Sequence, residues 1–232
     1  MKIKKAIILG AGFGKRMHPI TKKIPKPLVK INGVTLLENS IKFLSSIGVE
    51  HIVVNTHHLH KKMINYVNTN KFPSKVNIIV EKGKILDTGG GILNASKKFK
   101  NQIFYVLNPD TIWTKVYKKE FRKLEKAYSK HKKPTMLLVS RNKSYDKSFK
   151  GDFNLNNGLI SRDNSNEFIF TGLQILDQSV FSSIKDKKFS MNKIWDFLIK
   201  ENSLIGNTSK QKFYHLNTKE MYDKLSNLNI TD

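Results

Sequence analysis

Short apolar runs rich in β-branched residues alternate along this chain with segments of helical period, and this alternation limits the folds open to it. Strands that alternate with helices form parallel sheets covered by helices on both faces. The alternation therefore predicts an α/β fold with a mainly parallel sheet. The runs cover residues 5–9, 51–56, 76–81, 103–108 and 135–140.

The segments between and after the runs indicate helices and a second set of strands. Leu37, Ile41 and Leu44 recur at helical spacing before Gly48, and residues 117–131 have the pattern of an exposed amphipathic helix. In chain order, the elements expected after residue 150 are a hairpin over 153–161, a strand over 167–176, a helix over 191–202 capped by Ser190, a last strand over 212–216 and a helix capped by Thr218.

Length and composition narrow the class of protein. A chain of 232 residues suits one α/β domain, and we expect a single domain over 1–232. The absence of cysteine excludes a disulfide framework and thiolate chemistry. No stretch approaches the roughly 20 apolar residues of a membrane span, and the apolar run after the first lysines is too short for a secretion signal. We therefore expect a cytoplasmic protein that does not bind membranes.

The formal net charge of +24 raises the question of nucleic-acid binding. Of the 42 basic residues only four are arginine, which leaves 38 lysines, and these are spread over the whole length. The chain also lacks the sequence signatures of zinc fingers, homeodomains and RNA-recognition domains. We therefore expect a solvated lysine surface and small polyanionic substrates, without a nucleic-acid partner.

The first apolar run ends in a stretch rich in glycine, proline and basic residues, which covers residues 8–33. It is not a P-loop, because Arg16 stands where that motif needs Ser or Thr, and its glycines lack the dinucleotide-binding spacing. A tight turn into a helix would explain the glycines, but such turns usually have about two to six residues. Glycine N–H groups can approach an anion, and the prolines beside Lys26 restrict the loop. The stretch predicts a phosphate site, with Arg16 and Lys26 in a solvent-lined loop.

Three more candidate segments follow predicted strands. They are Asn55–His58, Asp87–Gly91 and Asn108–Asp110. Ligands of open α/β sheets bind outside the carboxyl ends of the strands, so we expect these segments and the glycine stretch to meet at one edge. Asp110 could cap a turn there or bind Mg²⁺. We favour Mg²⁺, because phosphoryl transfer needs a hard cation on oxygen.

Two of these segments have alternative structural interpretations. Asp87 or Thr88 could serve as the cap of a helix that starts there. His57, His58 and His60 have a spacing that permits zinc binding. We favour a polar cluster at the start of a helix for the histidines, because no carboxylate lies near them in sequence.

Part of the chain resembles the signature of the sugar-1-phosphate nucleotidyltransferases, namely residues 9–17, Pro19, Thr21 and residues 25–28. Residues 81–113 resemble the branch of that family with N-acetylmuramate-1-phosphate uridylyltransferase and the mannose-1-phosphate guanylyltransferases. The resemblance implies a three-layer α/β/α Rossmann-like fold. It also implies an enzyme that joins a nucleoside triphosphate (NTP) to a sugar 1-phosphate and releases pyrophosphate, with Mg²⁺ as cofactor.

The same resemblance implies roles for individual residues. Arg16 would neutralise the leaving pyrophosphate, Lys26 would hold phosphate near the reacting centre, and Asp110 would bind the metal. A nucleotide-binding lobe over 1–140 would contain Leu9, Gly10, Ala11, Gly12, Gly14, Glu81, Gly89 and Gly90, of which the last two would lie against the nucleobase. A sugar-binding lobe over 141–232 would act with Asn108 and contain Glu167, Thr171 and Gly172.

The chain departs from the family at the second metal ligand. Relatives place an Asp in a DVGT-like motif before the final helix, whereas this chain has His215 in that place and Asn217 at the glycine. Mg²⁺ prefers oxygen ligands, so neutral imidazole is a poor direct substitute. We therefore expect Asp110 to be the main protein ligand and His215 to be a weaker candidate that contacts phosphate or a metal-bound water. Asp196 is a further candidate for the missing carboxylate.

The base and the acceptor stay open. We favour UTP with N-acetylmuramate 1-phosphate, as in cell-wall nucleotide-sugar biosynthesis, and keep GTP with mannose 1-phosphate as the alternative. Transferases of phosphocholine or a molybdenum cofactor have similar glycine loops, but the triple glycine of residues 87–91 favours the sugar family. A nucleotide-sugar sensor without turnover is a further alternative, against which the joint presence of Arg16, Lys26 and Asp110 argues. We expect a monomer or a small homo-oligomer.

Overall fold

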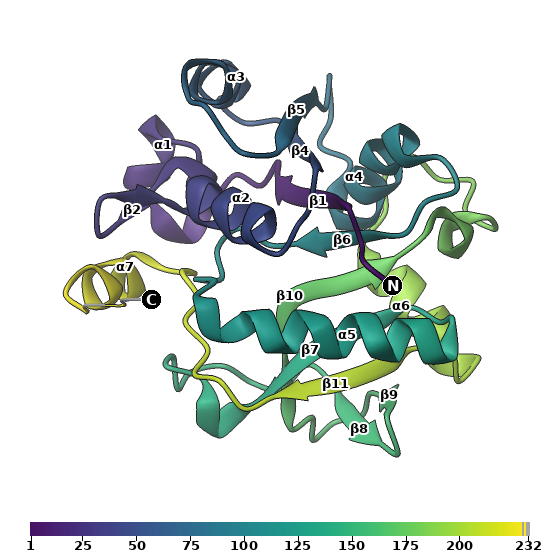
Figure 1. Ribbon diagram of the computed structural model, residues 1–232. Coiled ribbons are helices and arrows are strands. Elements are labelled where there is room, and N and C mark those ends of the chain that lie inside the picture. Colours follow the sequence, from purple (N-terminus) through teal and green to yellow (C-terminus); the bar gives the residue numbers. More distant parts are fainter. Residues whose placement is uncertain (229, 231–232) are drawn as a thin grey trace.

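A nine-stranded sheet runs through the molecule, whose residues 1–228 and 230 are described by a computed structural model (Figure 1). The strands lie in the order β5-β4-β1-β6-β10-β7-β11-β9-β8, and the ribbon β2-β3 stands apart from the sheet. In chain order the strands are β1 Lys5–Gly10, β2 Lys30–Ile31, β3 Val34–Thr35, β4 His51–Thr56, β5 Lys75–Val80, β6 Phe104–Leu107, β7 Thr135–Ser140, β8 Asn154–Asn156, β9 Leu159–Ser161, β10 Phe168–Leu176 and β11 Ile205–Ser209.

Most strands of the sheet run in one direction. β1 pairs in parallel with β4 and β6, β4 pairs in parallel with β5, and β7 with β11. β10 is antiparallel to both β6 and β7, so those two strands share a direction. β9 is antiparallel to β11 and β8. Among the described strands of the sheet, β9 and β10 therefore oppose the rest, and the predicted mainly parallel sheet is confirmed.

Helices cover both faces of the sheet, which confirms the predicted three-layer α/β/α arrangement. The apolar faces of α2, α3 and α5 pack in one core cluster, and those of α4 and α6 pack in another on the opposite face. α5 lies across β7 and β11 (Figure 1). No helix among the described residues is long and apolar enough to cross a membrane. In chain order the α-helices are α1 Ile20–Lys23, α2 Leu36–Ser46, α3 His60–Thr69, α4 Asp87–Ser96, α5 Lys118–His131, α6 Met191–Lys200 and α7 Lys219–Ser226.

The residues of β1 alternate between the two core clusters. Ala6 and Ile8 belong to the cluster under α2 and α5, whereas Ile7 belongs to the cluster under α4 and α6. Successive side chains of a strand point to opposite faces, so a strand buried on both faces must be apolar throughout. This explains why the central strands are the continuous apolar runs of the sequence.

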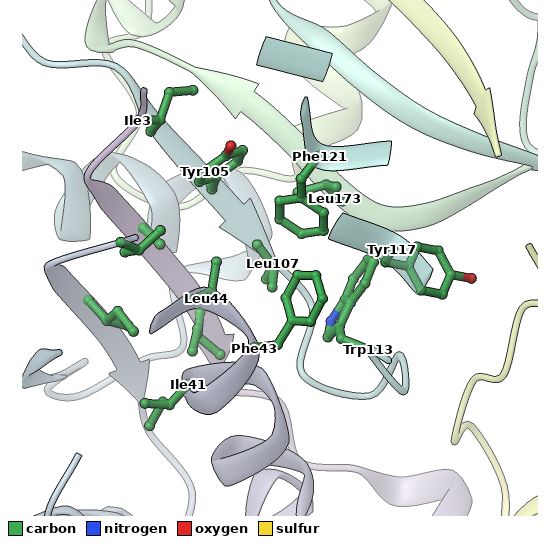
Figure 2. Close-up of a cluster of buried hydrophobic side chains, with 14 of the residues drawn as sticks. Ile3, Ile41, Phe43, Leu44, Tyr105, Leu107, Trp113, Tyr117, Phe121 and Leu173 are labelled. Atoms are coloured by element: carbon green, nitrogen blue, oxygen red, sulfur yellow. The ribbon is translucent and has the colours of Figure 1, made fainter. Parts of the chain in front are cut away.

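An aromatic cluster anchors the chain that follows β6 (Figure 2). The Trp113 ring lies 6.1 Å from the ring of Phe43 on α2 and 5.5 Å from that of Phe121 on α5. Asn39 clamps the same segment, because its side chain donates to the Trp113 carbonyl and accepts from the Trp113 N–H, both at 3.0 Å. The loop between β6 and Trp113 is therefore held rigidly at the end of the sheet.

Side-chain caps begin two of the predicted helices. The Ser190 hydroxyl accepts from the Asn192 N–H at the start of α6, and the Thr218 hydroxyl accepts from the Met221 N–H at the start of α7, which confirms both predicted caps. The alternative that Asp87 or Thr88 caps α4 is wrong. Leu86 holds the cap position without a side-chain cap, and the Thr88 hydroxyl accepts instead from the N–H of Met191, which joins α4 to α6.

The predicted last strand over 212–216 is wrong, because the strand forms earlier, at β11. Ile205–Ser209 contains Gly206 and Asn207, two residue types that strands disfavour, and the sequence gives no strand signal there. Residues 212–216 form isolated bridges only, from Phe213 to Ser144 and from His215 to Thr111. The apolar side chains of this segment fill the core around an extended connection, so an apolar run alone did not identify a strand.

Candidate active site

A cavity of about 410 Å³ lies outside the carboxyl ends of β1, β4 and β6. It contains residues from the glycine-rich loop and from each of the three other segments that follow strands, which confirms that they meet at one edge. The cavity is lined by Leu9, Gly10, Ala11, Gly12, Gly14, Lys15, Arg16, Lys26, Pro27, Asn55, Ile85, Asp87, Thr88, Asn108, Pro109, Asp110 and Asn217.

The glycine-rich loop brings the backbone of several glycines to the cavity. Gly14 has φ +63°, in the left-handed region, and its carbonyl accepts from the Thr21 hydroxyl at 2.8 Å. A Cβ on Gly10 would come within 2.8 Å of the Asn55 carbonyl, so β1 and β4 approach closely there. Gly12 faces open space, since no atom would lie within 4 Å of a Cβ at that position. A ligand can therefore approach the backbone at Gly12.

The two predicted cations of the loop have different environments. Arg16 is exposed in the short 3-10 helix η1 (Lys15–Met17), as expected of a solvent-lined loop. Lys26 begins the 3-10 helix η2 (Lys26–Leu28), and its Nζ lies 2.5 Å from Oδ2 of Asp110. The Lys26 side chain is only 15% exposed, so the expectation of a solvent-lined position is wrong for this residue.

Asp110 follows β6 and lies between two basic side chains. Lys26 contacts its Oδ2, and Nε2 of His215 lies 3.2 Å from its Oδ1. Burial raises the pKa of Asp110, but His215 and Lys26 lower that pKa by more, so it lies well below the usual range. The carboxylate is therefore ionised at neutral pH and is neutralised by its neighbours.

The connection before α7 places His215 beside Asp110. The Leu216 N–H donates to the Asp110 carbonyl at 2.7 Å, and the Ile112 N–H donates to the Tyr214 carbonyl at 2.9 Å. The His215 ring stacks on Phe213, with 5.7 Å between ring centroids. Two backbone hydrogen bonds and ring contacts with Phe213 and Phe149 thus fix the imidazole, although no regular strand forms there.

Two buried oxygen atoms at this site accept no hydrogen bond from the described residues. They are Oδ1 of Asn217 and Oδ1 of Asp110, of which the second still lies 3.2 Å from Nε2 of His215. The Asn217 Nδ2 donates to Oδ2 of Asp146 at 2.9 Å, which fixes the orientation of the amide. A hard cation prefers oxygen ligands, and both of these oxygen atoms are free of hydrogen bonds within the described part of the chain. The two oxygen atoms are therefore suitable ligands for Mg²⁺. Asp196 is not part of it, because it lies on α6 and pairs with Arg162 at 2.9 Å.

The glycines predicted to contact the nucleobase lie inside α4. A Cβ on Gly89 would come within 2.3 Å of the Phe189 ring, and a Cβ on Gly90 within 2.3 Å of the Lys187 carbonyl. Both glycines permit close packing of α4 against the segment before α6, and neither lines the cavity. Ile85, Asp87 and Thr88 line it in their place.

Of the predicted sugar-binding residues in the second half of the chain, Gly172 contacts Asn108. The Asn108 N–H donates to the Gly172 carbonyl at 2.9 Å, and Gly172 has φ +86°, which other residues rarely adopt. Thr171 is buried, and its hydroxyl donates to the Leu137 carbonyl at 2.9 Å. Glu167 is exposed at the start of β10. None of these three residues lines the cavity, whereas Asn108 does.

The three clustered histidines bind to backbone carbonyls. His57 Nδ1 lies 2.8 Å from the Glu81 carbonyl, His58 Nε2 lies 3.1 Å from that of Thr21, and His60 Nδ1 lies 3.2 Å from that of His57. Each ring therefore donates to a different carbonyl. The cluster fastens the start of α3 to the glycine-rich loop and to the end of β5.

Sequence reasoning missed two features of the site. Asn55 belongs to a candidate segment, but no role was predicted for its own side chain. It lines the cavity and is 2% exposed, so its amide is buried between neighbouring loops. Asp146, from an irregular segment, holds Asn217. A buried strand that ends in Asn was an available signal for the first residue. No local signal could have identified the second.

Curated proteins similar to this chain are enzymes that act on sugar 1-phosphates. N-acetylmuramate alpha-1-phosphate uridylyltransferase of Caulobacter vibrioides is 25% identical over 91% of this chain and 90% of its own length. D-glycero-alpha-D-manno-heptose 1-phosphate guanylyltransferase of Campylobacter jejuni is 34% identical over 47% of this chain, and the match spans about half (48%) of that protein.

Solved structures share the fold over nearly the whole chain. HddC from Yersinia pseudotuberculosis, solved in complex with GMP-PN, has a TM-score of 0.78 and 24% identity and covers 97% of this chain and 98% of its own. UDP-glucose pyrophosphorylase complexed with UDP-glucose has a TM-score of 0.79 and 19% identity, covering 97% of each chain. The sequence profile described as "Nucleotidyl transferase" matches residues 5–149. The chain therefore belongs to the nucleotidyl transferase family, as the motifs shared with the sugar-1-phosphate nucleotidyltransferases predicted.

Proposed function

We propose that this protein transfers a nucleoside monophosphate from an NTP to a sugar 1-phosphate, giving a nucleotide sugar and pyrophosphate. The observation that carries the proposal is the ion pair of Lys26 and Asp110 in the cavity of the glycine-rich loop. This arrangement brings a phosphate-binding cation and a metal-binding carboxylate to one point. Phosphoryl transfer needs both.

The chemistry proposed for the residues is alignment and charge neutralisation. A sugar phosphate is already an ionised nucleophile, so its attack on the α-phosphorus needs no general base. The open backbone at Gly12 would bind phosphate oxygens, and Lys26 would hold phosphate near the reacting centre. Arg16, exposed beside the cavity, would neutralise the leaving pyrophosphate, because its guanidinium can bind two phosphate oxygens at once.

The residues at Asp110 suit a divalent cation. Asp110 would be the main protein ligand through Oδ1, which accepts no hydrogen bond from residues 1–228 or 230, and His215, 3.2 Å from that atom, would contact phosphate or a metal-bound water beside it. When bound, Mg²⁺ neutralises charge on the phosphates and helps to orient them. Lys26 keeps the carboxylate ionised and in place before substrates arrive.

UTP and N-acetylmuramate 1-phosphate are the proposed substrates. The support is the uridylyltransferase relative, whose match spans nine-tenths of both chains. GTP with mannose 1-phosphate is the second candidate, supported by the mannose-1-phosphate guanylyltransferase 1 of Arabidopsis thaliana, which is 32% identical over 47% of this chain.

The test is pyrophosphate release over a grid of the four NTPs and several sugar 1-phosphates, with Mg²⁺ and with a chelator. We expect one pair to exceed the others and the chelator to abolish the signal. Silence over the whole grid, together with measurable binding of a nucleotide sugar, would contradict the enzyme and favour a sensor.

A further inference from the structure

A buried amide and a buried carboxylate connect the two loops on either side of the cavity. Asn55, at the end of β4, accepts from the Gly10 N–H at 2.9 Å through Oδ1 and donates to Oε1 of Glu81 at 2.7 Å through Nδ2. Glu81 follows β5, and its Oε2 accepts from the Leu86 N–H at 2.8 Å. The chain of hydrogen bonds therefore runs from the glycine-rich loop to residues 85–88.

Asn55 and Glu81 lie where the loss of a hydrogen-bond partner would cost free energy. Asn55 is 2% exposed and Glu81 is 3% exposed, so neither side chain can replace a lost partner with water. A Cβ on Gly91 would come within 2.6 Å of Asn55 Nδ2 and within 2.9 Å of Glu81 Oε1, so α4 packs closely on the pair and residue 91 has no room for a side chain. Each oxygen and nitrogen atom of the two side chains has a hydrogen-bond partner in this arrangement.

Resting on the proposed function, we infer that Asn55 and Glu81 are positioning residues for the NTP, which fix the glycine-rich loop relative to residues 85–88. Gly10 and Asn55 line the cavity, and so do Ile85, Asp87 and Thr88. A triphosphate at Gly12 and a base at residues 85–88 would need these two loops at a fixed separation. The pair sets that separation through its hydrogen bonds.

The geometry distinguishes this role from direct contact with the nucleotide. Both carboxylate oxygens of Glu81 already accept from protein donors, and Glu81 does not line the cavity. The predicted nucleotide-binding role of Glu81 therefore becomes an indirect one. Its effect on the nucleotide passes through Leu86 and Asn55.

Exchanging the two functional groups tests the inference. Asn55→Asp sets two carboxylates against each other, and Glu81→Gln sets an amide N–H against either Leu86 N–H or Asn55 Nδ2. In the double variant, Asp at 55 accepts from Gly10 and from Gln at 81, whose oxygen accepts from Leu86. Each single variant therefore has one mismatch, and the double variant has none.

Binding of UTP and of GTP, each with Mg²⁺, is measured by calorimetry on the intact chain, together with KM for the NTP and for the sugar 1-phosphate. We expect each single variant to weaken NTP binding roughly ten- to hundredfold, as for other residues that orient a site through their neighbours. The double variant should return to within about threefold of the parent. KM for the sugar 1-phosphate should change little.

A matched control separates positioning from general destabilisation. Ser74→Ala removes a hydroxyl that donates to the Val49 carbonyl at 2.6 Å, in a residue that is 6% exposed. Ser74 and Val49 precede β5 and β4, so they lie at the amino ends of these strands and the cavity lies at the carboxyl ends. This variant should lower the melting temperature and leave NTP affinity unchanged.

Two results would overturn the inference: single variants that bind the NTP like the parent, or a double variant no better than the singles. If Asn55→Asp does not fold, Glu81→Gln and the double variant still decide the question. Binding is measured without acceptor, so a lack of pyrophosphate release would contradict the proposed reaction alone.

Discussion

The ion pair of Lys26 and Asp110 allows catalysis and stability to be separated by mutation. If Lys26 holds phosphate during transfer, Lys26→Ala should lower kcat by about 10² to 10⁴, because it removes charge that acts in the transition state. The same change leaves Asp110 with His215 as its remaining basic neighbour, at 3.2 Å. Lys26→Ala should therefore also destabilise the protein without substrate.

The size of that destabilisation follows from the burial of the pair. Breaking a fully buried ion pair costs about 3–5 kcal/mol, and a hydrogen bond to a charged group contributes about 1.5–3 kcal/mol. Lys26 and Asp110 are 15% and 18% exposed, and His215 still compensates the carboxylate, so about 1–3 kcal/mol is expected. For a chain of this length the melting temperature falls by roughly 2–4 °C per kcal/mol. Pyrophosphate release and thermal unfolding measure the two effects separately.

The double variant Lys26→Ala, Asp110→Asn distinguishes a catalytic lysine from a mere counter-ion. Removing both charges leaves no buried unpaired ion, so stability should recover most of what Lys26→Ala lost. If both groups act on the reacting phosphates, turnover should stay at or below that of the single variant. Recovery of turnover in the double variant, or parental turnover in Lys26→Ala, would refute the reasoning and leave Lys26 the role of neutralising Asp110.

Four further results are expected. Arg16→Ala should lower kcat by about 10² to 10⁴ in pyrophosphate release and leave thermal unfolding unchanged, because the side chain is exposed. At saturating Mg²⁺, Asp110→Asn should lower kcat by about 10³ and His215→Ala by about tenfold or less; equal losses that both recover at higher metal concentration would make His215 a direct ligand. The pKa of Asp110 is lowered by folding, so the stability that its charge contributes is present above the unfolded pKa of about 3.9 and lost as pH falls below it. Denaturant titrations of the parent and Asp110→Asn should therefore differ above about pH 5 and converge in acid. Duplex DNA should bind weakly and dissociate as salt rises in a fluorescence titration, and sequence-specific, salt-resistant binding would contradict a solvated lysine surface.

The central part of the fold was predictable because its strands are buried on both faces. β4 and β7 have the bounds predicted from their apolar runs, and β1 extends the predicted run by Gly10. β11 was not predictable in the same way. Ile205–Ser209 forms a strand because its backbone pairs in parallel with β7, although its residue types have a low propensity for strands. Tertiary pairing overrode local preference at that edge.

The candidate site also has a part that could be predicted from local sequence and a part that could not. The glycine-rich loop carries its information within a continuous stretch, so the prediction that it binds phosphate rests on residue types and spacing alone. The partners of Asp110 are Lys26, which lies 84 residues earlier in the chain, and His215, which lies in the connection before α7. Such pairings depend on the register of the whole sheet. The same holds for Asn55 and Glu81, whose contact follows from the parallel pairing of β4 with β5.

The charges that line the cavity suggest why Asp110 is kept among bases. Lys15, Arg16 and Lys26 face Asp87 and Asp110 across one cavity, which gives a small positive sum before His215 is counted. An unpaired carboxylate there would repel a triphosphate and pay a desolvation penalty, whereas the contact with Lys26 removes both problems. Asp110 would hold a divalent cation bound with the phosphates, and Lys26 would then contact phosphate in place of the carboxylate. The ion pair of Lys26 and Asp110 would then be the form that these two residues adopt before substrates bind.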